Sequence, residues 1–240
     1  MKILLTGADG YIGTNLTKYL IRLGHSVDPW LHDIKSFRID KDYDYVIHLA
    51  ALTGVRKSME DPEPYWEVNV RGSKIVFDAC ESNNIPLLFA SSSNAREITN
   101  PYALTKYMNE VQRPPNSVGF RPHTVYPGRP DMLFDRLVNG KVDYINAMHF
   151  RDFTHIDDLC SAIVTIMENY DKLVGQVVDI GNGQAVSVLK MASAMGFKGE
   201  VRYGKTITER ETTCADIKPL QDLGWQPKIN IFNVINELYI

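Results

Sequence analysis

The chain has 240 residues, its 26 Lys and Arg against 29 Asp and Glu give a formal net charge of −3, and 44% of its residues are hydrophobic. These values are typical of a globular protein with one domain or two closely packed domains. Lys and Arg are scattered along the chain, so we expect no basic surface for nucleic acid and no membrane partner.

The cysteines and the N-terminal segment indicate the compartment. Cys80, Cys160 and Cys214 are odd in number and far apart, which fits neither a disulfide framework nor a zinc cluster. The first apolar run is too short for a signal peptide or a membrane span, and no long uncharged apolar stretch follows. We therefore expect a cytoplasmic protein with reduced thiols.

Short apolar runs alternate with segments of helical periodicity in the first half. The expected strands cover residues 3–5, 27–31, 45–50 and 86–90, and the expected helices cover residues 14–23 and 64–81. Apolar runs of this length are typical of strands that are buried on both faces. Their alternation with helices predicts a parallel sheet with helices on both sides.

The second half is less regular. We expect strands at residues 117–121 and 176–180, and helices at residues 131–139 and 156–170. No internal repeat, low-complexity segment or linker marks a domain boundary.

Three glycines separate the first strand from the first helix. Gly7, Gly10 and Gly13 stand at G-x-x-G-x-x-G spacing, where backbone can approach a pyrophosphate and helix amides can face it. The alternative is a tight turn with close strand–helix packing. Asp33 lies 20 residues beyond the last glycine and is our candidate for the adenosine ribose, with Asp28 as its competitor. No arginine follows immediately, which favours NAD over NADP.

Three alternating aspartates raise the question of a metal. Asp40, Asp42 and Asp44 look like the start of a calcium loop, but Tyr45 stands where that loop requires glycine and no glutamate ends it. We therefore expect no metal site, and we place Asp40 near the adenine.

A tyrosine and a lysine four residues apart form the second chemical signal. Tyr102 and Lys106 share one face of a helix whose first turn holds Pro101. A nearby ammonium and a positive nicotinamide ring would favour the phenolate, so the tyrosine could act as a general acid/base. A serine run, residues 91–93, ends the preceding strand and points into the crevice where parallel sheets bind ligands. The alternatives are an amphipathic surface pair and turn-forming serines.

These motifs resemble the extended short-chain dehydrogenase/reductase family, in its NAD-dependent nucleotide-sugar epimerase/dehydratase branch. The matching segments follow in family order: residues 6–13, 48–51, 69–73, 90–93 with Tyr102 and Lys106, 121–126, 151–158, 180–183, and 215–216 with 223–225. The resemblance covers nearly the whole chain.

The resemblance implies a fold and a division of the chain. The fold is α/β, a Rossmann-like doubly wound parallel sheet with a small C-terminal α/β substrate-binding part. Residues 1–120 would form the NAD(P)-binding Rossmann domain. Residues 121–240 would form a mixed substrate-binding part, some of whose strands and helices return to the sheet.

The resemblance also implies site residues. The catalytic set would be Ser93, Tyr102 and Lys106. The NAD site would comprise Gly7, Gly10, Tyr11, Ile12, Gly13, Asp33, Asp40, Leu49, Ala50, Ala51, Thr53, Asn69, Ser91, Tyr102 and Lys106. The substrate would contact Ser93, His123, Thr124 and Arg151. Arg151 suits a substrate phosphate, and its alternative is a structural salt bridge with Asp152 or Asp157.

Several departures from the family bear on function. Only eight residues separate Ser93 from Tyr102, and residues 33–44 are also compressed. The helix after Lys106 is cut off by prolines at 114 and 115, which weakens an expected homodimer contact. The Asp-Glu pair typical of 4,6-dehydratases is absent after Ser93, which disfavours dehydration.

These observations lead to one expected function and two alternatives. We expect an NAD-dependent epimerase of a nucleoside diphosphate sugar, with C4 as the expected carbon and transient hydride transfer to bound NAD. The first alternative is an NAD(P)H-dependent reductase or dehydrogenase of a keto-sugar or small carbonyl compound. The second is a redox-inactive dinucleotide-binding protein.

Overall fold

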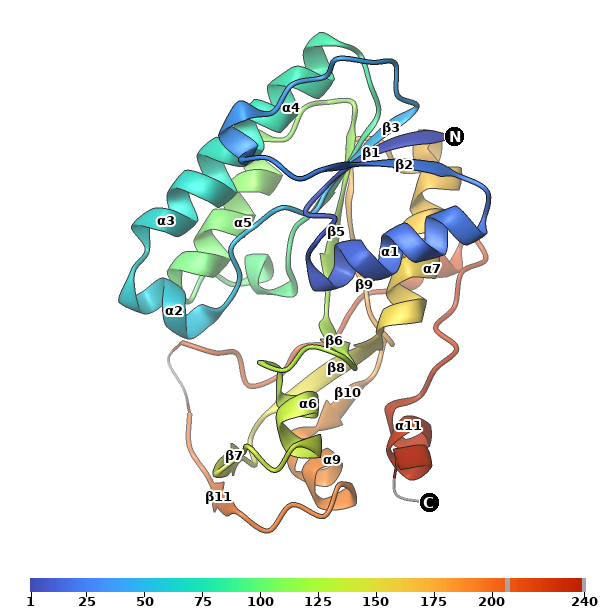
Figure 1. The fold of residues 1–240 in the computed structure, drawn as a ribbon. Helices are drawn as coiled ribbons and strands as arrows, with labels where there is room; N and C mark the ends of the chain where they lie inside the picture. The colour runs from blue at the N-terminus through green and yellow to red at the C-terminus, as the bar shows by residue number, and fades with distance from the viewer. Residues whose placement is uncertain (206–207, 239–240) are drawn as a thin grey trace.

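A six-stranded parallel sheet forms the centre of the computed structural model, which describes residues 1–205 and 208–238 (Figure 1). The strand order is β2-β1-β3-β4-β5-β9. The strands are β1 (Lys2–Thr6), β2 (Ser26–Trp30), β3 (Tyr45–His48), β4 (Leu87–Ala90), β5 (Ser117–Pro122) and β9 (Val177–Ile180). The doubly wound, Rossmann-like architecture expected from the sequence is confirmed.

Helices cover both faces of this sheet. On one face lie α1 (Tyr11–Arg22) and α7 (Ile156–Glu168), with the short α8 (Tyr170–Leu173) and α10 (Lys218–Gln221) beside α7. On the other lie α2 (Val55–Glu60), α3 (Glu63–Tyr65), the π-helical η2 (Trp66–Gly72), α4 (Ser73–Ser82) and α5 (Pro101–Gln112). In the described part of the chain no helix is long and apolar enough to cross a membrane.

Alternate residues of the first strand feed two separate cores. Ile3 and Leu5 pack with Leu16 and Leu20 of α1, whereas Leu4 packs with Phe77 on the α4 side. Side chains of a strand point alternately to opposite faces, so an uninterrupted apolar run is required here. The leucines of α1 lie four residues apart, which places them on one face of the helix.

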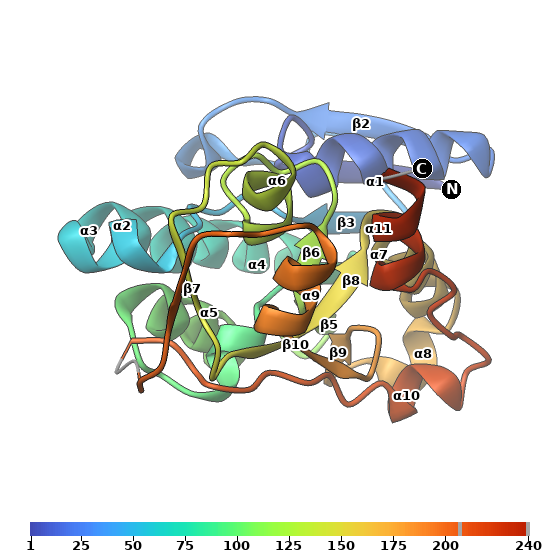
Figure 2. The same ribbon diagram turned by 90° about the horizontal axis from the view of Figure 1, so that it is seen from below.

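The rest of the chain forms a smaller unit beyond the carboxyl ends of the strands, which lies below the sheet in Figure 1 and in front of it in Figure 2. Its three-stranded sheet has the order β10-β8-β6. The elements are β6 (Thr124–Tyr126), α6 (Leu133–Val138), β7 (Tyr144–Asn146), β8 (Phe150–His155), β10 (Ala185–Ser187), α9 (Val188–Ala194), β11 (Glu200–Arg202) and α11 (Ile231–Leu238). It has its own core, in which Phe134, Phe153 and Met191 are buried.

The connection between β2 and β3 is short, and it leaves β2 at the edge of the sheet. It contains only the turn η1 (Ile34–Ser36) and a segment that returns along β2. Tyr43 of this segment donates to Asp28 in the middle of β2, and Asp44 donates its N–H to the Lys2 carbonyl at the amino end of β1. Within the described residues no strand lies beyond β2. The shortened segment at residues 33–44 thus makes the sheet end at β2 on this side.

Candidate active site

The glycine turn follows β1 at the carboxyl edge of the sheet. Gly7 has φ +67°, and a Cβ there would lie 2.7 Å from the Ala50 nitrogen. A Cβ at Gly13 would lie 2.0 Å from the Gly7 carbonyl oxygen. Real side chains never approach backbone so closely, so the strand, the turn and α1 can meet only through glycine.

The N-terminus of α1 has the form expected for a pyrophosphate site. Gly10 occupies the N-cap position and supplies no side-chain cap, and the first turn has no acidic residue. The backbone N–H groups of Tyr11, Ile12 and Gly13 therefore lack a side-chain acceptor of the usual kind, and a helix N-terminus favours an anion. These residues fit the diphosphate of a dinucleotide.

The segment after β3 lies beside this turn and carries Leu49, Ala50, Ala51 and Thr53. Asn69 holds it in place: its Oδ1 accepts from the Leu52 N–H at 2.8 Å and its Nδ2 donates to the Leu52 carbonyl at 3.0 Å. Asn69 is fully buried. Its amide thus acts on the backbone of the segment rather than facing the crevice.

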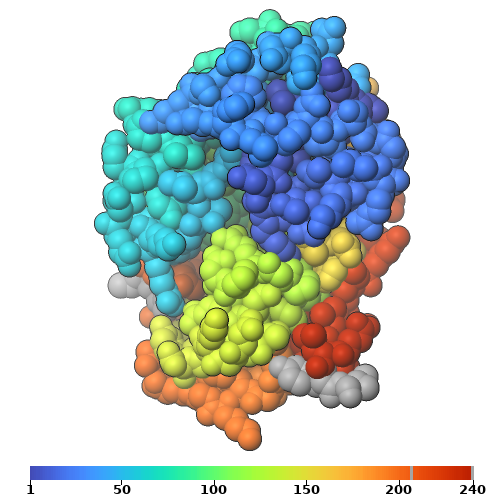
Figure 3. All heavy atoms as spheres, viewed as in Figure 1, coloured from blue at the N-terminus to red at the C-terminus, as the bar shows by residue number. Residues whose placement is uncertain are grey.

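A second segment closes over the turn from the smaller unit. The Tyr11 hydroxyl donates to the Pro127 carbonyl, and Arg129 donates to the Thr53 hydroxyl at 2.7 Å. Burial, followed by the Asp135 charge, raises the pKa of Tyr11, so its hydroxyl stays a hydrogen-bond donor. In Figure 3 the yellow-green part of the chain lies against the dark-blue and cyan segments.

Three aspartates are candidates for binding the adenosine part of NAD. Asp28 lies in the middle of β2 and accepts from Tyr43 at 3.0 Å, so it is engaged away from the carboxyl edge. Asp33 follows β2 at that edge, is exposed, and caps η1 by accepting the N–H two residues on at 2.9 Å. Asp40 is exposed on the segment that returns along β2 toward its amino end. Of the three aspartates, Asp33 is the one that lies just past the carboxyl end of β2.

Tyr102 and Lys106 lie on the first turns of α5. Asn100 caps this helix by accepting from the Ala103 N–H at 2.8 Å, and Pro101 occupies the first position. The buried Lys106 ammonium donates to the Ala90 carbonyl at the end of β4, at 2.7 Å. Burial lowers the pKa of Lys106 to about 8, and the Glu110 charge opposes this shift.

Of the three serines at the end of β4, Ser92 is the one that affects the ionisation of Tyr102. Burial raises the pKa of Tyr102, while a hydrogen bond with the Ser92 side chain and the charge of Arg129 lower it. Ser92 Oγ accepts from the Asn94 N–H at 3.2 Å, so its own hydroxyl proton stays available for another acceptor. Ser93, the serine expected from the sequence, begins the turn η3 (Ser93–Arg96).

The first serine of the run points away from the crevice. Ser91 is buried and its hydroxyl donates to Glu110, which also pairs with Arg121. The hydroxyl is thus engaged inside the protein, and the expected contact of Ser91 with the cofactor stays a prediction without a free hydroxyl to support it.

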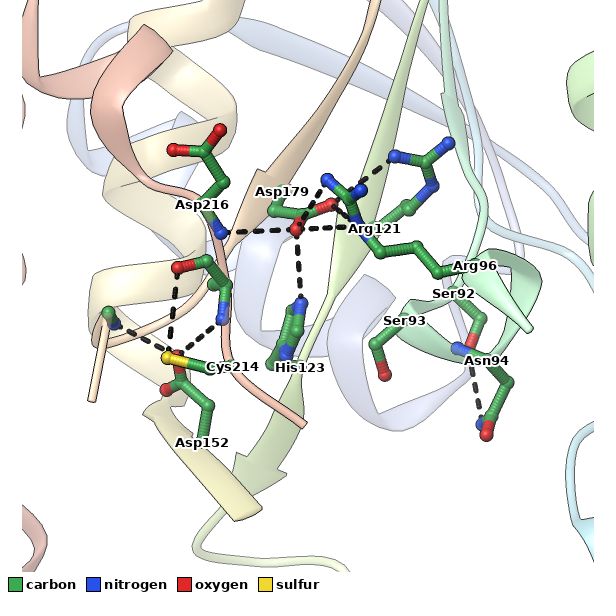
Figure 4. Close-up of polar contacts among 12 residues, drawn as sticks. Ser92, Ser93, Asn94, Arg96, Arg121, His123, Asp152, Asp179, Cys214 and Asp216 are labelled. Carbon is green, nitrogen blue, oxygen red and sulfur yellow. Dashed lines mark hydrogen bonds and ion pairs between the residues drawn. The ribbon is translucent and has the colours of Figure 1, made fainter. Parts of the chain in front are cut away.

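His123 requires a correction. It is an expected substrate contact, but its side chain is 0% exposed and its Nε2 lies 3.4 Å from Asp179 Oδ2 (Figure 4). The imidazole packs between elements of the core, so it is out of reach of a substrate. Thr124, the next residue, begins β6 and is half-buried.

Arg151 and Arg210 lie close enough for their charges to act on each other. Arg151 of β8 donates to the Glu211 carbonyl at 2.9 Å and lies 3.4 Å from the Glu209 carboxylate. Burial lowers the pKa of Arg151, and the charge of Arg210 adds to this effect. Arg210 donates to the Ser93 carbonyl at 3.1 Å. The salt bridge of Arg151 is therefore with Glu209, not with Asp152 or Asp157 as the alternative reading had it.

The described geometry combines a glycine turn that fits a dinucleotide with Tyr102 and Lys106 on α5, and a family model decides the class of the protein. A model of the NAD dependent epimerase/dehydratase family matches residues 3–181. The chain belongs to this family.

Relatives of this epimerase/dehydratase chain are similar over their whole length. Protein CapI of Staphylococcus aureus is 30% identical, over 99% of this chain and 97% of its own. The uncharacterized UDP-glucose epimerase YtcB of Bacillus subtilis is 28% identical, over 96% and 94%. The solved UDP-glucuronic acid 4-epimerase of Bacillus cereus, in complex with UDP-glucuronic acid and NAD, is 26% identical with a TM-score of 0.88, over 100% and 98%.

Family membership confirms the resemblance drawn from the sequence. The protein is an NAD-dependent enzyme of the extended short-chain dehydrogenase/reductase type, and the expectation of NAD as cofactor is confirmed. Three side chains that the sequence did not single out act on the expected site residues: Ser92 and Arg129 lower the pKa of Tyr102, and Arg210 donates to the Ser93 carbonyl. Ser92 was hidden among equivalent serines, whereas the two arginines lie in irregular segments with no motif of their own.

Proposed function

We propose that the protein is an NAD-dependent epimerase that inverts C4 of a nucleoside diphosphate sugar. The observation that carries this proposal is the position of Tyr102 on α5, one helical turn from Lys106, whose ammonium donates to the Ala90 carbonyl at the carboxyl end of β4. The similarity to the Bacillus cereus 4-epimerase along the whole chain supports the same reaction.

Tyr102 moves the proton in this proposal. The chemistry that NAD supplies when bound is reversible hydride acceptance. The Tyr102 oxygen accepts the proton of the sugar C4 hydroxyl as the C4 hydrogen leaves as hydride. After the resulting ketone has rotated to present its other face, the hydride returns to C4 and Tyr102 returns the proton to the oxygen. Ser92 and Arg129 favour the phenolate that this step requires. Ser93 would hydrogen-bond the sugar oxygen.

We propose the following cofactor contacts. The diphosphate lies on the amides of Tyr11, Ile12 and Gly13, beside the turn formed by Gly7 and Gly10, and Asp33 accepts from the adenosine ribose. Leu49, Ala50, Ala51 and Thr53 line the dinucleotide, Asn69 supports them, and Lys106 holds the nicotinamide ribose. The contacts of Asp40 and Ser91 stay predictions. In this arrangement residues 1–120 bind the cofactor and residues 121–240 bind most of the substrate.

The substrate side is best suited to a uridine diphosphate sugar. Arg151 and Arg210 lie close together, and exchange of their carboxylate partners for a diphosphate would keep both guanidinium groups paired. Arg129 adds a positive charge that acts on Tyr102 from the other side. A guanidinium there favours a sugar with a carboxylate, as in the UDP-glucuronic acid bound by the Bacillus cereus enzyme.

We further propose a homodimer formed by α5. Leu104, Tyr107 and Val111 are exposed along this helix at helical spacing. A groove of about 340 Å³ beside them is lined by apolar residues that include Trp66 and Ile98. A second copy of the chain would cover this surface.

A cytoplasmic location belongs to the proposal as well. The three cysteines are free thiols, two of them buried, which fits a reducing compartment.

The proposal is tested by identifying the bound dinucleotide and the stabilising sugar. The purified protein is denatured, the released nucleotide is identified by mass, and the intact protein is heated with UDP-glucuronate, UDP-glucose, or GDP- and dTDP-sugars. We expect NAD at near-stoichiometric amount and a raised Tm with UDP-glucuronate, because a ligand of the folded state stabilises it. Absence of NAD together with stabilisation by NADPH alone would contradict the proposal and favour a reductase.

A further inference from the structure

Arg96 lies on the turn between the catalytic serines and the catalytic tyrosine. Its Nε lies 3.2 and 3.0 Å from the two carboxylate oxygens of Asp179, and its Nη2 lies 2.9 Å from Oδ2 (Figure 4). The contact is bidentate, which fixes both distance and orientation. The turn η3 is thereby attached to β9 in the central sheet.

Asp179 is a rigid receptor for this arginine. Its side chain is 0% exposed, and it also contacts Arg121 at 3.4 Å, His123 at 3.4 Å and the Asp216 N–H at 3.2 Å. Although burial opposes ionisation, the His123 and Arg96 side chains hold the pKa of Asp179 well below its usual range. Its carboxylate is therefore charged at neutral pH and keeps partners when one is removed.

The connection that Arg96 anchors is short. Ser92 caps η3, Arg96 ends it, and α5 begins at Pro101. The turn η3 packs against α5, so the position of Ser92 relative to Tyr102 depends on where η3 is held. The Arg96 side chain is 40% exposed, so its replacement removes an anchor without opening a cavity in the core.

We propose that Arg96 is a positioning residue, which holds η3 on the Asp179 carboxylate and thereby keeps Ser92, the N-cap of η3, in place beside the first turn of α5 that carries Tyr102. The consequence for turnover rests on the proposed function, whereas the effect on Tyr102 itself does not.

The ionisation of Tyr102 reports the position of the Ser92 side chain. Burial and Tyr65 raise the pKa of Tyr102, and the hydrogen bond from Ser92 and the charge of Arg129 lower it. Arg129 lies on the segment after β6 and Tyr65 on α3, so neither depends on η3. Loss of the Ser92 contact alone should therefore raise the pKa of Tyr102.

The test compares Arg96→Gln with the matched control Arg202→Gln, which removes another partly exposed arginine whose carboxylate partner, Glu200, lies at 2.8 Å. The phenolate absorbance of Tyr102 is isolated by subtracting the spectrum of Tyr102→Phe in each background, and is followed against pH. We expect Arg96→Gln to raise the midpoint by about one pH unit, and Arg202→Gln to leave it unchanged.

Kinetics with the active nucleotide sugar supply the second measurement. We expect Arg96→Gln to lower kcat by about 30-fold with KM changed by less than about 3-fold, and Arg96→Lys to recover part of kcat. An unchanged Tyr102 midpoint and kcat in a folded Arg96→Gln protein would overturn the inference. If the wild type turns over no sugar while the midpoint still shifts, the proposed function fails and the positioning role stands.

Discussion

Ser92 and Ser93 are chemically identical neighbours, yet they occupy different surroundings. Ser92 accepts from the Asn94 N–H and lowers the pKa of Tyr102, whereas Ser93 starts η3 with its carbonyl bound by Arg210. The turn that follows the strand decides which hydroxyl faces α5. Function at this scale depends on a difference of one residue in the chain.

This difference predicts unequal effects of two alanine substitutions. We expect Ser92→Ala to lower kcat by about 10- to 100-fold and to raise the pKa of Tyr102, because a hydrogen bond to a charged oxygen is lost. We expect Ser93→Ala to act mainly on KM, because its hydroxyl is assigned to the sugar. Steady-state kinetics over pH separate the two, and equal profiles for both variants would contradict the assignment.

His48 provides a pH-dependent test of the buried polar network under the site. Its ring nitrogens lie 2.7 Å from Thr6 Oγ1 and 2.9 Å from Ser73 Oγ, and burial lowers the pKa of His48 to about 3. Between pH 6.5 and about 3 the unfolded chain therefore binds a proton at this residue that the folded protein does not.

Stability should thus fall as pH decreases below 6.5. We expect the free energy of unfolding to drop by about 2 kcal/mol from pH 6.5 to 5 through His48 alone. In His48→Gln this part of the slope should vanish, and in His32→Gln, a change at an exposed residue, it should remain. Urea unfolding at both pH values measures it, and identical slopes for wild type and His48→Gln would rule out a neutral buried His48.

At the scale of elements, the site depends on how closely β1, its turn and α1 approach one another. A Cβ at Gly13 would lie 2.0 Å from the Gly7 carbonyl oxygen, whereas a Cβ at Gly204 would meet no atom within 4 Å. The two positions form a matched pair for testing whether close approach or loss of glycine flexibility matters.

We expect Gly13→Ala to lose NAD on purification and to unfold more easily by about 1–3 kcal/mol, because the turn and helix must move apart. Gly204→Ala should keep both its NAD and its stability. The NAD content after denaturation and the urea midpoint test this, and a Gly13→Ala protein with full NAD would refute the close-approach argument.

On the scale of the whole molecule, the exposed side of α5 raises the question of assembly. Val111 is 58% exposed and ends the apolar row on this helix. We expect Val111→Glu to shift the protein from dimer to monomer in sedimentation, because it places a charge in an apolar contact. The control Val138→Glu changes an equally apolar but separate residue on α6. A wild type that sediments as a monomer would exclude the proposed dimer.

The sequence predicted the sheet better than the smaller unit, for a physical reason. Strands such as β1 and β4 are buried on both faces and so appear as apolar runs, and α1 and α7 carry clear helical periodicity. Three-residue strands such as β7 and β11 are too short to show a period. The π-helical η2 lay inside one expected helix, because hydrophobic spacing does not distinguish an i to i+5 turn.

The candidate site likewise contains residues that a sequence pattern reveals and residues that it does not. Gly7, Gly13, Tyr102 and Lys106 could be found because backbone approach and helical spacing leave marks in the sequence. His123 was placed on the substrate side although it is buried, because its surroundings come from β9, far along the chain. Pairings of this kind, including that of Arg96 with Asp179, depend on tertiary contacts alone.

The most direct test of the account is to incubate the NAD-bound enzyme with UDP-glucuronate carrying deuterium at C4 and to analyse the products by NMR. We expect the 4-epimer with deuterium retained at C4, no net accumulation of NADH, and a rate reduced by about 10²- to 10⁴-fold in Tyr102→Phe. Loss of deuterium to solvent, or full activity in Tyr102→Phe, would contradict it.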